Sequence, residues 1–152
     1  MDKSKRLPDK VSDLIRAANR DLLEVAQDPR YRLYAHDWHQ VHPKADKCSI
    51  CYAGAVMAGA LGADPERTVM PVHFDHHTEV RLLLLDHLRS ASWGAALESL
   101  NDGSDDPASW PDELFFELAE LEGEIPEFTA ETVGNFVDTM EMIAAIFEKH
   151  GL

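Results

Sequence analysis

The stretch AETVGNFVDTMEMIAAIFEK, residues 130–149, carries the most regular hydrophobic pattern of the chain. Its apolar residues recur every three or four positions, which places them along one face of an α-helix. We therefore predict a helix over this stretch, with Thr129 as its cap and an apolar face that packs into a core. The residues of that face are Val133, Phe136, Val137, Met140, Ile143, Ala144 and Phe147.

A second helix is predicted just before this one. Ser109 stands three residues before Asp112, which resembles a capping box, and Pro111 suits the first turn of a helix. Gly123 is a typical residue for the helix end. The apolar residues that would pack inward are Leu114, Phe115, Leu118 and Leu121.

Further helical patterns run through the first hundred residues. Weaker alternation over residues 31–38, and a short apolar run at 69–74, favour at most one two-stranded β pair. We therefore predict a mainly α fold, a compact bundle of about five helices. The additional helices are expected over residues 9–27, 47–61 and 75–90, followed by a short one that reaches Leu100.

A chain of 152 residues is expected to form a single domain over residues 1–152. Within it, residues 101–152 form a strongly acidic helical C-terminal part. No apolar run is long enough to span a membrane, and no apolar stretch follows the charged N-terminus. With only two cysteines, three positions apart, we expect a cytoplasmic protein.

Charge is distributed very unevenly along the chain. Residues 1–89 hold 13 acidic and 13 basic side chains, whereas residues 90–152 hold 15 acidic ones and a single base, Lys149. The whole net charge of −14 therefore comes from residues 90–152. Such a block repels nucleic acid and anionic lipid and attracts basic protein surfaces. We expect no direct nucleic-acid binding and no membrane binding.

The acidic residues around the helix predicted at 112–123 are the candidate partner-binding site. On one helix, Glu113, Glu117, Glu120 and Glu124 would share a face, and no nearby base relieves their repulsion. Six carboxylates over twelve helical residues give one charge per roughly 3 Å, close to the roughly 3.4 Å phosphate spacing of one DNA strand. This pattern suits either a solvated face that aids solubility or a mimic of nucleic acid that binds a basic, nucleic-acid-binding partner. The candidate residues are Asp105, Asp106, Asp112, Glu113, Glu117, Glu120, Glu122, Glu124, Glu127 and Glu131.

Cysteines and histidines form the second cluster. Zinc prefers four nitrogen or sulfur ligands, and Cys48 with Cys51, three positions apart, could share one ion with His39 and His76. The same two thiols could instead form a redox pair at a helix start, or be small buried core residues. Zinc is therefore the one cofactor that the sequence suggests.

Common catalytic motifs are absent from the sequence. It contains no GxGxxG, GxxxxGK[ST], HExxH or GxSxG pattern. A small hydrolase remains a third hypothesis, and it requires His39 or His76 beside a carboxylate in a concave pocket. We expect a non-enzymatic protein.

Two segments resemble small uncharacterised accessory proteins of tailed phages and prophages. They are CSICYAGAVMAGALGADPERT at residues 48–68 and VRLLLLDHLRSASWGAALESL at residues 80–100, about a third of the chain. In those proteins a Cys-x-x-Cys-x-Ala-Gly-Ala-Val-Met-Ala run precedes an aliphatic helix. The resemblance implies a phage accessory protein, a class whose small acidic members are often anti-CRISPR or anti-restriction inhibitors. It implies no catalytic residue.

Overall fold

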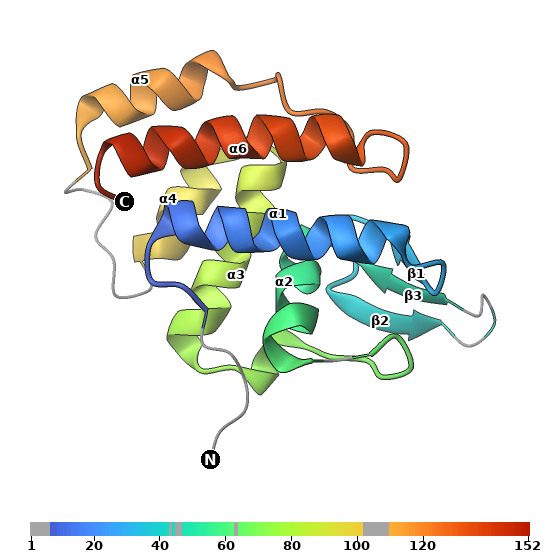
Figure 1. Cartoon of the computed structure of the whole chain (residues 1–152). Helices are drawn as coiled ribbons and strands as arrows, with labels where there is room; N and C mark the ends of the chain where they lie inside the picture. Colours follow the sequence, from blue (N-terminus) through green and yellow to red (C-terminus); the bar gives the residue numbers. More distant parts are fainter. Residues whose placement is uncertain (1–6, 43, 45–46, 63, 102–109) are drawn as a thin grey trace.

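The structure of the chain is a computed structural model, and it describes residues 7–42, 44, 47–62, 64–101 and 110–152 (Figure 1). The predicted mainly α class is confirmed, but the sheet has three strands where at most two were expected. The described helices are α1 (Val11–Gln27), α2 (Tyr52–Leu61), α3 (His76–Arg89), α4 (Trp93–Asn101), α5 (Asp112–Glu120) and α6 (Val133–Lys149), with a 3₁₀ turn η1 (Pro71–His73). The strands are β1 (Tyr31–Leu33), β2 (His39–His42) and β3 (Lys47–Ile50).

The core is formed where α1 and α6 lie side by side over α2, α3 and α4 (Figure 1). The apolar stripe predicted for residues 130–149 is buried along α6, from Phe136 to Phe147. Leu14, Ile15 and Leu22 of α1 are buried in the same core. Helix α2 is buried on nearly all sides, because its alanines and glycines let neighbouring elements approach closely.

Helix α2 is shorter than predicted, because residues 47–50 form strand β3. Cys51 has an extended backbone, and its sulfur accepts a hydrogen bond from the Gly54 amide at 3.3 Å, so that it caps the helix. A β-carbon at Gly54 would lie 1.5 Å from the Trp38 carbonyl oxygen, which explains the glycine there. The helix ends at Leu61, and Gly62 follows as its cap in the left-handed conformation.

The sheet has the order β1-β3-β2, so that the last strand in the chain is the central one. β1 runs parallel to β3, with Tyr31 opposite Cys48, and β2 runs antiparallel to it, with His39 opposite Ile50. The predicted pairing of residues 31–38 with 69–74 is therefore wrong. Pro71 begins a 3₁₀ turn instead, and the Val69 amide donates to the His39 carbonyl of β2 at 2.9 Å.

In the C-terminal part, α5 lies on the outer side of α6, at one edge of the molecule (Figure 1). α5 ends at Glu120, earlier than predicted, and Gly123 follows in the left-handed conformation. α6 begins at Val133, because the hydroxyls of Thr129 and Thr132 lie 2.7 Å apart and hold a turn before it. Thr129 is therefore not the cap. Ser109, predicted to cap the preceding helix, lies outside the described residues.

Across the described ranges, no helix has both the length and the apolar character that crossing a bilayer requires.

Candidate functional site

Seven of the predicted carboxylates are exposed on α5 and on the connection to α6. We call them the acidic segment: Asp112, Glu113, Glu120, Glu122, Glu124, Glu127 and Glu131. None of the seven forms an ion pair with a residue that the structure describes. Asp105 and Asp106 lie outside the described residues. The acidic segment thus carries negative charge that the described part of the protein leaves unneutralised.

Glu117 behaves differently from its neighbours. Its Oε1 accepts from Lys149 Nζ at 2.7 Å and lies 3.1 Å from His150 Nε2, so that the side chain turns toward the end of α6. These bonds lower the pKa of the Glu117 carboxyl. The prediction that no nearby base relieves the repulsion among these glutamates is therefore wrong at Glu117. The row of four glutamates is also broken at Glu124, which lies beyond the helix end.

Two further acids of the C-terminal part are paired with α1. Arg16 contacts Glu148 and also lies 3.6 Å from Glu141 Oε2, measured from its Nε atom. Asn19 donates a 2.9 Å hydrogen bond to the other oxygen of Glu141. The neutral first part of the chain therefore neutralises some acids of the last third, and what remains exposed is concentrated in the acidic segment.

Phe116 is a feature of this surface that the sequence reasoning missed. Its side chain is 70% exposed, although Leu114 and Leu118 on the same helix are buried. The adjacent Phe115 takes the inward position and stacks on Trp110, with ring centroids 6.0 Å apart. The sequence signal was the spacing, because Phe116 stands two residues from both Leu114 and Leu118, about 200° around the helix from that buried row.

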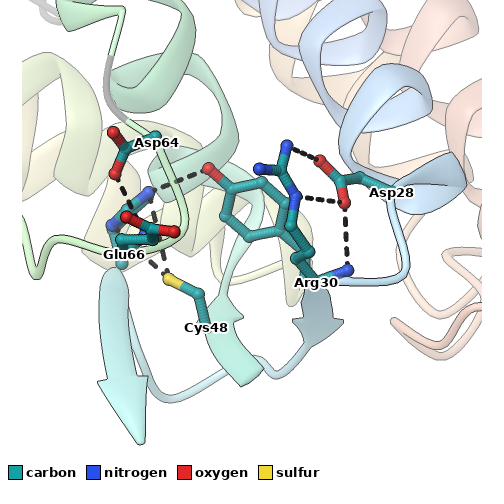
Figure 2. A network of polar contacts seen from close by, with 7 residues as sticks. Asp28, Arg30, Cys48, Asp64 and Glu66 are labelled. Carbon is teal, nitrogen blue, oxygen red and sulfur yellow. Dashed lines mark hydrogen bonds and ion pairs between the residues drawn. The ribbon is translucent and has the colours of Figure 1, made fainter. Parts of the chain in front are cut away.

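The cysteine and histidine cluster lies on the sheet, beside a separate ion pair between Arg30 and Asp28 (Figure 2). The sulfur of Cys48 lies 3.6 Å from Nδ1 of His39 and 3.9 Å from Nε2. The Tyr31 hydroxyl lies 3.2 Å from His39 Nε2. The residues share one face of the sheet because Tyr31 is the register partner of Cys48, and His39 is the partner of Ile50, two positions from Cys48 on β3.

Burial governs the chemistry of this cluster. Desolvation raises the pKa of the Cys48 thiol to about 11 and lowers the pKa of His39, so that both groups are neutral near pH 7. A nucleophilic cysteine needs a lowered pKa, usually from a charged histidine. His39 bonds to the Tyr31 hydroxyl, and no carboxylate bonds to its ring among the described residues. The arrangement therefore does not support the hydrolase hypothesis at His39.

The four predicted zinc ligands do not come together. Cys48 and His39 meet, but the Cys51 sulfur caps α2, and His76 is exposed at the start of α3. No group of three His, Cys, Asp or Glu side chains among the described residues is arranged to hold a metal. The predicted tetrahedral set is thus not formed.

A disulfide between the two cysteines is also excluded by backbone geometry. The chain is extended from Cys48 through Cys51, which separates their α-carbons by roughly 10 Å. Disulfides need α-carbons within about 7 Å. Burial raises the pKa of Cys51 to about 12, which suppresses its thiolate as well. The redox hypothesis is therefore not supported, and both thiols are buried core residues.

A hollow of about 270 Å³ lies between α1, α2 and the start of β1, and an adjoining one of about 380 Å³ extends along the two helices. Asp21, Glu24 and Gly59 line both. The Asp21 carboxylate lies directly against Gly59, where a β-carbon would come within 2.5 Å of it. Gly59 therefore leaves room for the Asp21 side chain of α1 against the backbone of α2.

Comparison with known proteins finds no family model, no curated protein and no solved structure that matches this chain. Proposals about its function therefore depend on its own residues and their geometry.

Proposed function

We propose that this chain is a non-enzymatic binding protein whose acidic segment occupies a basic groove on a partner that normally holds nucleic acid. The observation that carries the proposal is the set of seven exposed carboxylates without ion-pair partners in the described part of the chain. By filling the groove, the protein would exclude nucleic acid and inhibit the partner. We extend the proposal to an inhibitor of a host defence complex, of the anti-CRISPR or anti-restriction kind, which is the role that a resemblance to phage accessory proteins implies.

Local stability does not account for this charge. Asp112 and Glu113 suit the start of α5, where the helix dipole favours negative charge. Glu120 stands at the opposite end, where the dipole disfavours it, and Glu122 and Glu124 follow directly. Like charges three or four residues apart cost roughly 0.2–0.5 kcal/mol per pair. Retaining acids at these positions fits a function in binding.

The acidic segment is attached to an ordered scaffold. Leu114 and Leu118 anchor α5 in the core, and the contacts of Glu117 with Lys149 and His150 fix its outer side. Binding from a preformed surface loses less conformational entropy than binding from a disordered tail. The helix can therefore present its carboxylates in a constant arrangement, as a nucleic-acid strand presents phosphates.

The expected mechanism is electrostatic competition. A basic groove that contacts phosphates binds with a strong salt dependence, and carboxylates in their place should show the same behaviour. Association should be fast at low salt, and the affinity should fall steeply as salt rises. The partner would be a nuclease or a nucleic-acid-guided complex within the host cytoplasm.

The test uses displacement of labelled DNA from a panel of purified basic nucleic-acid-binding proteins, including a restriction endonuclease and a CRISPR surveillance complex. We expect displacement from at least one, with an affinity that falls at least tenfold between about 50 and about 200 mM salt. The triple variant E113Q/E120Q/E124Q should lose most of this displacement. The matched control D13N/E24Q/E66Q removes as much charge from exposed positions elsewhere and should displace normally. Equal loss in both variants, or no salt dependence, contradicts the proposal.

A further inference from the structure

An exposed aromatic ring sits among the carboxylates of α5. Phe116 is 70% exposed. Asp112 and Glu113 lie four and three residues before it, and Glu120 lies four residues after it. Residues at these spacings are neighbours on a helix surface. Because Glu117 turns away to Lys149, the ring is flanked by acids that have no ion-pair partner among the described residues.

We propose that Phe116 is an aromatic anchor of the acidic segment and that the partner is a protein with a groove for single-stranded nucleic acid. The inference rests on the proposed function and narrows it to one kind of groove. In that groove the phenyl ring would take the place of a base on an aromatic stacking platform. The flanking carboxylates would take the places of phosphates.

The choice between duplex and single strand follows from what each presents to a protein. A duplex keeps its bases stacked inside and offers phosphates along its outside, so a mimic of it needs carboxylates alone. A single strand offers its bases as well, and grooves that bind it combine basic residues with aromatic side chains on which bases stack. An exposed ring among carboxylates has a counterpart only in the second kind of groove.

The spacing along α5 agrees with this assignment. Asp112 and Glu120 each stand four residues from Phe116, which is about 6 Å along the helix axis at about 1.5 Å per residue. That separation is close to two nucleotide steps of about 3.4 Å. The ring and its flanking charges therefore fall within the length of a few nucleotides, which matches the span of an aromatic platform with its basic rim.

Exposure of an apolar side chain is not in itself unusual, so position must be considered as well. Val72 is 74% exposed, but it is aliphatic and lies in η1, outside the acidic segment. Phe116, in contrast, is exposed, aromatic and flanked by acidic residues. Val72 therefore supplies a matched control for the loss of an exposed apolar side chain.

The experiment measures displacement of a fluorescent oligothymidylate from an OB-fold single-strand-binding protein, and of a labelled duplex from an architectural minor-groove protein. The chain should displace the single strand and spare the duplex. F116A should weaken that displacement at least tenfold, as loss of one stacked base does, while F116W retains it. V72A should displace the single strand as strongly as the unmodified protein does. Phe116 is exposed, so its replacement leaves the core intact, and circular dichroism and thermal melting verify this.

The outcomes separate the two proposals. Displacement that is unchanged in F116A but lost in E113Q/E120Q/E124Q overturns the anchor and leaves the acidic segment as the binding surface. Displacement of the duplex alone overturns the assignment to a single-strand groove. Displacement of neither probe overturns the single-strand assignment, and the proposed function then depends on the wider panel above.

Discussion

The hydroxyl of Tyr52 donates a 2.6 Å hydrogen bond to Oδ1 of Asn19, and both side chains are almost completely buried. Asn19 in turn donates from Nδ2 to Glu141. The three residues come from α2, α1 and α6, so this short chain of bonds crosses the centre of the fold. Burial raises the pKa of Tyr52 well above its usual value, which keeps the hydroxyl available as a donor.

Replacing Tyr52 with phenylalanine tests how much this hydrogen bond contributes to the free energy of unfolding. The ring still packs edge-on against Phe136, but Asn19 Oδ1 loses its donor in a region that excludes water. We expect the free energy of unfolding to fall by about 1–3 kcal/mol, measured by urea denaturation. Tyr34→Phe, at a 40% exposed position, should change it by less than about 0.5 kcal/mol. Equal effects would show that the buried bond contributes nothing specific.

Gly54 and Gly134 provide opposite tests of helix packing. Alanine at Gly54 would place its β-carbon 1.5 Å from the Trp38 carbonyl oxygen, in contact with backbone that cannot swing away. We expect a loss of at least about 3 kcal/mol or failure to fold. Gly134 in α6 has open space around it, so alanine there should stabilise by up to about 1 kcal/mol. Thermal melting of both variants checks the contrast.

The two cysteines should react slowly in the folded protein. Burial raises the pKa of Cys48 to about 11 and that of Cys51 to about 12, so little thiolate forms near neutral pH. An aromatic disulfide reagent should label both thiols in denaturant but neither within minutes under native conditions. Fast native labelling of Cys48 would instead reveal an activated thiol and revive the catalytic hypothesis.

His39 should make stability depend on pH. Its pKa is lowered in the folded protein, chiefly by desolvation, whereas the unfolded chain takes up a proton near its ordinary value of 6.5. Below pH 6.5 the unfolded state therefore binds more protons, and the free energy of unfolding falls as the pH drops. The loss should approach but not exceed about 1.4 kcal/mol per pH unit. His39→Gln should flatten this part of the profile relative to the unmodified protein.

Most helices could be predicted because their signal is local. The stripe from Val133 to Phe147 repeats at the helical period, and the structure buries it from Phe136 to Phe147. Helix ends were less predictable because they depend on particular bonds, as the hydroxyl pair of Thr129 and Thr132 shows. The sequence pattern predicts helix over residues 47–50 because the small residues that follow dominate it, whereas the structure forms strand β3 there. Its strand character comes from pairing with Tyr31–Leu33, a contact that no local period records.

The acidic residues could be found from the sequence. Which of them form ion pairs and which remain exposed could not. Glu117, Glu141 and Glu148 look like their neighbours in the sequence, yet each pairs with a base that folding brings near. Arg16 stands 125 residues before Glu141, so no spacing rule connects them. The orientation of Phe116 likewise depends on how α5 rotates against α6. The surface that remains for binding is a tertiary property.

The order of the sheet has a consequence for how the protein is made. β1 and β2 do not pair with each other, because β3 separates them and comes last in the chain. A growing chain that has reached residue 42 therefore has two strands and no ladder between them. Both ladders close together when residues 47–50 insert, so the paired amide protons of β1, β2 and β3 should gain and lose exchange protection as one unit.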